Sequence, residues 1–229
     1  MVIEAELPAE EGAVTLASAV YRRLRQDIIA GHLKPNAKLN IKQLCEQFGS
    51  ALSPVREALN RLAPEGLVQQ IDNRGFVVAP ISVSEMNDLT LARCWMNEFA
   101  LRDAITHGDT AWEENLVLAL HRLSRTPRGE NDEAQHETWS RMHRDFHSAL
   151  IAGCRSKRIL RYCEETFLSA ERYRHIARRS SKRWVNKVDH DAITQAALDR
   201  KADLAVELLN RHFLRTAELV ESVLAKAGV

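Results

Sequence analysis

Residues 41–78 read IKQLCEQFGSALSPVREALNRLAPEGLVQQIDNRGFVV, and this stretch decides the fold of the first part of the chain. Residues 41–48 have the amphipathic pattern of a short helix, and Asn40 has a side chain suited to its N-cap. Residues 49–52 contain a glycine and predict a turn. The stretch therefore begins as a short helix followed by a tight turn.

A second helix is predicted over residues 53–62, with Ser53 as its N-cap and Pro54 in its first turn. Its apolar residues recur at the i, i+3, i+4, i+7 spacing of one buried face and are Val55, Ala58, Leu59 and Leu62. Two short helices joined by a turn with a glycine are typical of a helix-turn-helix.

Two strand-like segments follow, residues 67–71 and 76–79. Turn-forming residues, Asp72-Asn73-Arg74-Gly75, stand between them, so the pair predicts a β-hairpin. A helix-turn-helix followed by such a hairpin is a winged helix, which is a DNA-binding fold.

Several motifs occur in a fixed order between residues 14 and 80. They are Tyr21-Arg22-Arg23-Leu24-Arg25-Gln26-Asp27-Ile28-Ile29-Ala30-Gly31, Leu33-Lys34-Pro35, Ser53-Pro54-Val55-Arg56-Glu57-Ala58-Leu59, Glu65-Gly66-Leu67-Val68 and Arg74-Gly75-Phe76. In this order they resemble the GntR family of bacterial transcription regulators. Three positions depart from the family pattern. Asn36 replaces the usual glycine after proline, and asparagine also tolerates positive φ. Leu52 stands where many members carry a base-reading residue, and Pro64 ends the recognition helix early.

The N-terminal end of the second helix is the end that normally meets base edges in a helix-turn-helix. Arg56 at this end can read a guanine or hold a phosphate, and Arg74 at the wing tip can enter the minor groove. The candidate DNA contacts are Arg25, Lys42, Ser53, Arg56, Asn60 and Arg74. A solvated surface residue is the alternative for each. Glu57 is predicted to pair with a neighbouring arginine, because a carboxylate facing phosphate would be repelled.

Charge and composition agree with a DNA-binding domain in the first part of the chain. The 229 residues carry a net charge of +1, which by itself demands no nucleic acid. Residues 14–80, however, hold nine Lys and Arg against five Asp and Glu, a net charge of +4. The predicted organisation is a disordered arm over residues 1–13, a winged helix-turn-helix domain over 14–80, and an all-α effector-binding and dimerisation domain over 81–229.

The four cysteines, Cys45, Cys94, Cys154 and Cys163, form no CxxC pair and lie in helical patterns. They favour free buried thiols in a reducing compartment. The sequence shows no apolar run of membrane-spanning length and no signal peptide. We therefore expect a cytoplasmic protein with no membrane partner.

Every segment from residue 82 onward has a helical pattern. The expected helices are residues 84–107, 111–125, 132–153, 156–178, about 184–199, and 201–226. They predict an all-α bundle, so the whole chain is mainly α with one small hairpin. This arrangement is similar to the FadR-type subgroup of the GntR family, whose C-terminal helical domain is called FCD. The residues that carry this resemblance are Arg93-Cys94-Trp95-Met96, Phe146-His147, Asp189-His190 and Arg211-His212-Phe213. Trp139, His143 and Glu171-Arg172-Tyr173-Arg174 make it look closest to carbon-starvation and glutarate-type regulators.

Four histidines have placements that suit a metal site. His143 and His147 are four residues apart on one helix, so their rings point the same way. His190 and His212 lie on the inward faces of two further helices, and neutral imidazoles suit a divalent metal such as Zn²⁺ or Ni²⁺. A hydrogen-bonded core histidine is the alternative for each. Four further histidines are predicted to lie at the surface, namely His107, His121, His136 and His175.

The FCD resemblance adds expectations about these residues. FCD domains commonly hold a metal with one aspartate and three histidines, and His143 stands at the position of that aspartate. Arg93 resembles a family position that faces the ligand cavity, where a guanidinium can clamp a carboxylate, although an internal ion pair is an equal alternative. Arg172 and Tyr173 are further candidates for effector binding.

The favoured function is a metabolite-responsive DNA-binding regulator, a repressor released by a small carboxylate that binds at the His-lined metal site of the helical domain, with dicarboxylates among the candidates. One winged helix discriminates poorly between sequences, so a homodimer on a palindromic operator is expected. The first alternative is a metal-dependent hydrolase or isomerase that uses the histidine cluster. The second is a regulator for which the metal itself is the signal. The absence from the sequence of an HExxH motif, a nucleophile motif and a Gly-rich phosphate loop favours a regulator over an enzyme.

Overall fold

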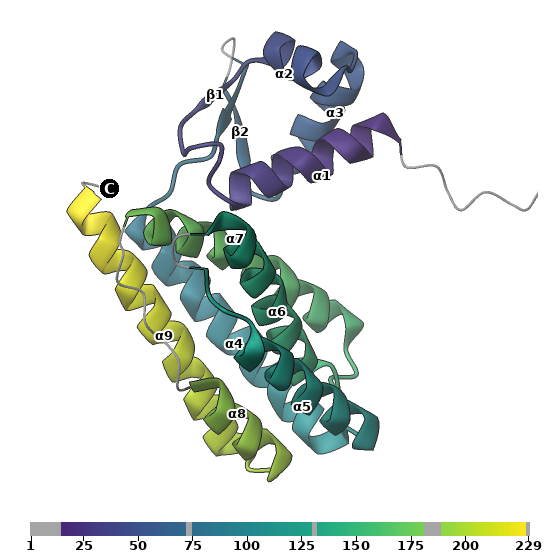
Figure 1. Ribbon diagram of the computed structural model, residues 1–229, viewed down its shortest axis with the longest axis vertical. Coiled ribbons are helices and arrows are strands. Elements are labelled where there is room, and N and C mark those ends of the chain that lie inside the picture. Colours follow the sequence, from purple (N-terminus) through teal and green to yellow (C-terminus); the bar gives the residue numbers. More distant parts are fainter. Residues whose placement is uncertain (1–14, 72–74, 130–131, 181–188, 228–229) are drawn as a thin grey trace, which may run out of the picture. The chain divides into compact units, whose positions relative to one another are not determined.

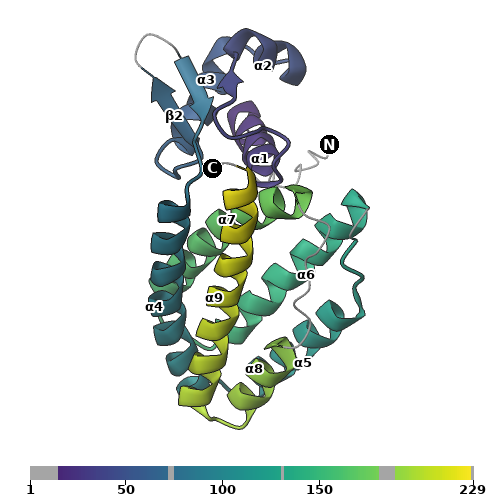
Figure 2. The same cartoon turned by 90° about the vertical axis from the view of Figure 1, so that its left-hand side faces the viewer.

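The computed structural model describes residues 15–71, 75–129, 132–180 and 189–227, and every structural statement below concerns these residues. The chain divides into two compact units, Met1–Pro80 and Ile81–Val229. Figures 1 and 2 show the helices and strands of each unit from two directions. The fold is mainly α, as predicted.

The N-terminal unit is a winged helix. Its elements are α1 (Leu16–Ile29), β1 (Lys38–Leu39), α2 (Ile41–Phe48), α3 (Leu52–Leu62), β2 (Val68–Ile71) and β3 (Gly75–Val78). Asn40 caps α2 as predicted, because its side chain accepts from the backbone N–H groups of Lys42 and Gln43. Gly49 ends α2 in the left-handed conformation, with φ of 56°, and this allows the sharp turn into α3. The apolar face of α3 is buried against α1 and the sheet.

The prediction that Ser53 caps the second helix is wrong. Helix α3 begins at Leu52, and its N-cap is Ala51, which makes no side-chain cap hydrogen bond. Residue Ala51 is extended and Leu52 is already helical, so Ser53 lies inside the helix. Pro54 is tolerated there because the first-turn N–H groups of a helix have no intrahelical partner.

The wing contains one more strand than the sequence suggested. The sheet is antiparallel with the order β1-β3-β2, and the two residues of β1 pair with Phe76 and Val77 of β3. A strand of two residues is too short to show alternation, so sequence patterns could not reveal it. Asn36 has a positive φ of 63°, as its place in the turn before β1 required. The hairpin tip, and with it Arg74, lies outside the described residues.

The C-terminal unit consists of helices α4 (Val83–His107), α5 (Thr110–Arg125), α6 (Glu133–Ile151), α7 (Lys157–Ser180), α8 (Asp189–Leu198) and α9 (Ala202–Ala227). Helix α4 lies against α7 and α9, as Figure 2 shows for α4 and α9, while α5 packs on α6 and α8 on α9. The core of this unit contains Leu101, Phe146, Leu150, Ile193 and Leu209, which are all fully buried. The predicted all-α bundle is confirmed.

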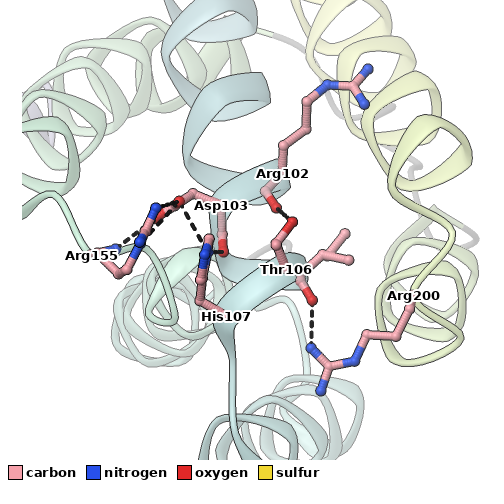
Figure 3. Close-up of polar contacts among 7 residues, drawn as sticks. Arg102, Asp103, Thr106, His107, Arg155 and Arg200 are labelled. Atoms are coloured by element: carbon pink, nitrogen blue, oxygen red, sulfur yellow. Dashed lines mark hydrogen bonds and ion pairs between the residues drawn. The ribbon is translucent and has the colours of Figure 1, made fainter.

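Arginines from two inter-helix turns hold the C-terminal end of α4 in place (Figure 3). Arg155, in the turn before α7, donates from its backbone N–H and its guanidinium to Asp103. This contact lowers the pKa of Asp103 to about 2. Arg200, in the turn before α9, donates to the carbonyl oxygens of Ile105 and Gly108. The last carbonyls of α4 thus have partners, which fixes this long helix within the bundle.

Candidate functional site

The four histidines predicted as metal ligands come together inside the bundle. His143 and His147 lie on α6, His190 lies on α8 and His212 lies on α9, and all four are buried. One ring nitrogen of each lies within 4.8 Å of the corresponding nitrogens of the others. Helix periodicity placed the first two on one face, and the packing of α8 and α9 supplies the other two.

Burial keeps these imidazoles neutral. Removal from water lowers the pKa of each ring, and the pKa of His190 falls to about 3. The positive guanidinium of Arg174 lowers the pKa of His143 further, and His212 has the same effect on His147. Neutral imidazole is the form that binds a divalent metal, so the rings are ready for ligation near pH 7.

The surroundings of His190 and His212 fit a metal ion. The Nδ1 atom of His212 lies 3.4 Å from an Asp189 carboxylate oxygen, which leaves Nε2 free to ligate. This contact is the largest cause of the lowered pKa of Asp189. The Nε2 atom of His190 is buried and has no hydrogen-bond partner among the described residues. A cation among the four rings would satisfy that nitrogen.

His143 is held differently from the other three. The Nη1 atom of Arg174 lies 2.9 Å from His143 Nδ1, and a guanidinium only donates hydrogen bonds. Nδ1 therefore accepts, and the proton of the neutral ring is on Nε2, which lies 3.1 Å from His147 Nε2. Ligation through Nε2 requires that proton to move to Nδ1 and Arg174 to turn away. Arg174 is also paired with Glu171, so it has a partner in either position.

We expect Arg174→Gln to tighten zinc binding roughly tenfold, the lower end of the effect of groups that orient a ligating histidine. The glutamine amide oxygen can accept a hydrogen bond from the Nδ1–H group of His143, while its N–H₂ group can still donate to Glu171. Competition against a chromophoric chelator measures the affinity. Arg178→Gln is the matched control, because Arg178 lies one turn further along α7 and pairs with Glu133. Equal or weaker zinc binding by Arg174→Gln would contradict this account of His143.

A cavity of about 190 Å³ opens beside His147, between α4, α6, α7 and α9. Its polar lining consists of Arg93, Asn97, His147, Ser148 and Glu164. Its larger apolar lining residues are Ile151, Leu160, Phe167 and Phe213. A mostly apolar cavity with a few polar groups is the usual form of a small-molecule site, and this volume suits a small metabolite.

Arg93 is the buried cation of this cavity. Its guanidinium lies over the Phe213 ring at 4.1 Å, and its Nε atom has no hydrogen-bond partner among the described residues. Burial and the nearby Arg174 lower the pKa of Arg93 to about 10, so it remains charged at neutral pH. A buried cation with an unused donor is a natural partner for an anionic ligand.

The other two candidates for effector binding do not line the cavity. Tyr173 donates its hydroxyl to Glu85 at 2.5 Å and accepts from the backbone N–H of Ser82. Arg172 is buried next to Tyr173, also outside the cavity lining. The residues of α7 that line the cavity, Leu160, Cys163, Glu164 and Phe167, lie on one face of the helix. The 100° step per residue turns positions 172 and 173 away from that face. Tyr173 instead holds the beginning of α4.

The prediction that His136 and His175 lie at the surface is wrong. Both rings are buried and meet edge to face, with 5.0 Å between their centroids. Their spacing carried the missed signal, because His136 lies seven residues before His143 on the inward face of α6. His175 likewise lies four residues after the buried Glu171. His107 and His121 are exposed, as predicted.

The candidate DNA contacts of α2 and α3 are exposed. They are Lys42, Ser53, Arg56 and Asn60, and Leu52 at the start of α3 is 52% exposed. The buried apolar face of α3 leaves these side chains on the opposite side, which is the side that a DNA groove would meet.

Two other cations of the N-terminal unit have partners within the protein. Arg25 donates to Glu65 at 2.7 Å, so contact with DNA would require this ion pair to open. Arg61 lies over the Tyr21 ring and is 4.0 Å from Glu57, which is the arginine contact predicted for Glu57.

None of the described helices has the length and apolar character needed to cross a lipid bilayer.

Comparison with known families matches residues 16–78 to bacterial regulatory proteins of the gntR family and residues 88–215 to the FCD domain. The chain is 34% identical to the uncharacterized HTH-type transcriptional regulator BphR of Paraburkholderia xenovorans, over 90% of this chain and 85% of BphR. It is 32% identical to the HTH-type transcriptional repressor GlaR of Escherichia coli, over 90% of this chain and 96% of GlaR.

Solved structures give the same fold. E. coli McbR/YncC matches with a TM-score of 0.73 and 18% identity, over 92% of this chain and 99% of that one. A putative GntR regulator from Rhodococcus matches with a TM-score of 0.70 and 22% identity, over 90% and 97% of the two chains.

Proposed function

The chain belongs to the GntR family of bacterial transcription regulators and carries an FCD domain, and from this premise we propose that it is a metabolite-responsive repressor. Its relatives are named transcription regulators and not enzymes. In the proposed mechanism, the exposed face of α3 binds an operator near the protein's own gene. A small carboxylate then binds in the cavity of the FCD domain and releases the DNA.

One observation carries the choice of a carboxylate. Arg93 is a fully buried cation at a cavity wall, and its Nε atom has no partner among the described residues. A buried cation costs free energy unless an anion pairs with it. A carboxylate matches the planar fork of a guanidinium.

The four neutral imidazoles beside this cavity support a divalent metal, Zn²⁺ or Ni²⁺, bound by His143, His147, His190 and His212. An ion held there would supply positive charge and could accept a carboxylate oxygen as a further ligand. His147 belongs to both the cluster and the cavity lining, so a ligand in the cavity reaches the edge of the metal site. No carboxylate from the described part of the chain belongs to the cluster, and this favours a borderline metal over a hard one.

Helix α4 connects Arg93 in the cavity lining to the chain segment that precedes the helix. Arg93 lies ten residues after Val83, which is about 15 Å along the helix axis. Tyr173 binds both Ser82 and Glu85 at the start of α4. A ligand on Arg93 thus acts on the helix that leads directly from the DNA-binding unit, and it shifts the population between DNA-binding and released states.

An exposed apolar stripe on α4 supports dimerisation. Leu91, Trp95 and Phe99 are four residues apart on one face and are 47%, 65% and 56% exposed. An exposed tryptophan between two large apolar residues resembles the core of a protein interface. The proposed occupant is the same stripe of a second copy, because a palindromic operator requires a two-fold dimer.

We expect Trp95→Ala to weaken the dimer at least about 30-fold, because the substitution removes an interface tryptophan. Analytical ultracentrifugation over a concentration series measures the dissociation constant. Leu118→Ala on α5 is the control, because Leu118, like Trp95, is an exposed large apolar residue but lies outside the stripe. A dimer constant that stays the same in Trp95→Ala would place the interface elsewhere.

The test of this function combines DNA binding with ligand addition. Salt-sensitive binding to the gene's own upstream DNA is expected, together with release when a small carboxylate is added. The same titration in the presence of a chelator shows whether release requires metal. Release by Zn²⁺ alone, without any carboxylate, would instead establish a metal-sensing regulator. Binding of carboxylates without any effect on DNA would contradict the repressor mechanism.

A further inference from the structure

The cavity lining contains a buried cation, Arg93, and a partly exposed carboxylate, Glu164, and from this we propose that the effector is a carboxylic acid with a hydrogen-bond donor at its other end. That donor is a hydroxyl or ammonium group on a short apolar chain. Glu164 is the residue that selects this group and disfavours a second carboxylate. The inference rests on the proposed function, because it narrows the class of carboxylate that binds beside Arg93.

The inner end of the cavity is cationic. Arg93 is fully buried, and Asn97, one turn further along α4, uses its amide N–H₂ to donate to the Arg93 carbonyl. His147 lines the cavity as well. The Arg93 guanidinium therefore gives this end a positive charge, and its planar fork suits one carboxylate.

The outer end of the cavity is anionic. The Glu164 side chain is 40% exposed, which places it where the cavity meets solvent. Among the described residues, the polar contacts of its carboxylate are long, with Ser148 Oγ at 3.5 Å and Arg144 Nε at 3.9 Å. Hydrogen bonds this long are weak, and an exposed ion pair is screened by water. The Glu164 oxygens therefore retain acceptor capacity for a donor on the ligand.

Most of the remaining lining is apolar. It contains Ile151, Leu160, Phe167 and Phe213, with the thiol of Cys163 beside them. Burial raises the pKa of Cys163 to about 12, so this thiol is uncharged. Methylene groups match such a wall, and a cavity of about 190 Å³ accommodates a short chain.

These features favour one donor over a second acid group. A hydroxyl or ammonium group donates to Glu164, and hydrogen bonds to a charged acceptor are among the stronger ones in proteins. A second carboxylate cannot donate and carries the same charge as Glu164. We therefore expect a preference of at least about tenfold for the hydroxy or amino acid over the diacid of equal length.

The test uses matched acids on the full-length protein. Calorimetry compares butanoate, 4-hydroxybutanoate, 4-aminobutanoate and succinate, followed by the five- and six-carbon sets, each with zinc and with chelator. We expect a hydroxy or amino acid to bind at least tenfold more tightly than the diacid of the same length. If the diacid binds as tightly as the hydroxy acid and the amino acid at every chain length, the inference is overturned and the proposed function remains intact. Absence of binding by every acid would overturn both.

Two variants test whether Glu164 causes the preference for a hydroxy or amino acid over the diacid. Glu164→Gln should reduce the preference to threefold or less, because the amide removes the negative charge and keeps the shape. Arg144→Gln is the matched control, since it removes the neighbouring exposed cation and lies outside the cavity lining. The preference should persist or increase in Arg144→Gln. An unchanged preference in Glu164→Gln would remove Glu164 from its assigned role.

Discussion

His147→Ala should bind zinc at least about 100-fold more weakly than the unchanged protein. Zinc sites with four protein ligands bind with about 10–16 kcal/mol, so one ligand contributes roughly 3 kcal/mol. His147 has its Nε2 atom 3.1 Å from that of His143, and it approaches both His190 and His212. Its loss therefore opens the middle of the cluster. Elemental analysis after dialysis, followed by chelator competition, measures the effect.

Two further variants separate metal loss from misfolding. His121→Ala removes an exposed histidine on α5 and should keep full metal content. His212→Ala removes a second cluster member that belongs to α9 and should reproduce the loss. Circular dichroism checks that each variant keeps its helices. Full zinc occupancy in His147→Ala would exclude this residue from the ligand set.

Arg56→Ala should lower operator affinity about 100-fold or more while the protein remains folded. A bidentate arginine–guanine contact contributes about 1–3 kcal/mol, and a dimer on a palindrome makes it twice. Arg56 is exposed at the N-terminal end of α3, whereas the neighbouring Val55 and Leu59 form the core. The substitution therefore leaves the core untouched. Fluorescence anisotropy at fixed salt measures the affinity, and a thermal melt checks the fold.

The control for Arg56 is a cation of the same unit outside the helix-turn-helix. Lys34 is exposed in the turn before β1, and Lys34→Ala should weaken binding only a few-fold through the loss of one charge. The two variants also differ in specificity. Loss of a base-reading group narrows the gap between operator and unrelated DNA, whereas loss of a general charge weakens both equally. Unchanged operator affinity in Arg56→Ala would contradict the assigned contact.

Local patterns predicted the N-terminal unit well. The apolar spacing of Val55, Ala58, Leu59 and Leu62 gave the buried face of α3, and Asn40 gave the start of α2. These features depend on residues a few positions apart, which sequence displays directly. The prediction of Ser53 as the N-cap was wrong because several residues near a turn can begin a helix. The extended backbone at Ala51 decides that the helix begins at Leu52.

Local patterns predicted the ligand site less completely. The four-residue spacing of His143 and His147 put both rings on one face of α6. The resemblance of the chain to FCD domains pointed to Arg93. Nothing in the sequence separated Arg172 and Tyr173 from the cavity, or revealed that Glu164 lines it. Those facts depend on the rotation of α7 about its own axis, which its packing against α4, α6 and α9 fixes.

By itself, the sequence determined the helix-turn-helix, the hairpin and the all-helical bundle, because the period of apolar residues reports which face of each element is buried. Tertiary structure alone decided that Arg174 meets His143, that His136 and His175 are buried, and that Arg93 and Glu164 line one cavity. The physical reason is distance along the chain. Arg174 is 31 residues from His143, and only the packing of one helix against another brings such residues into contact.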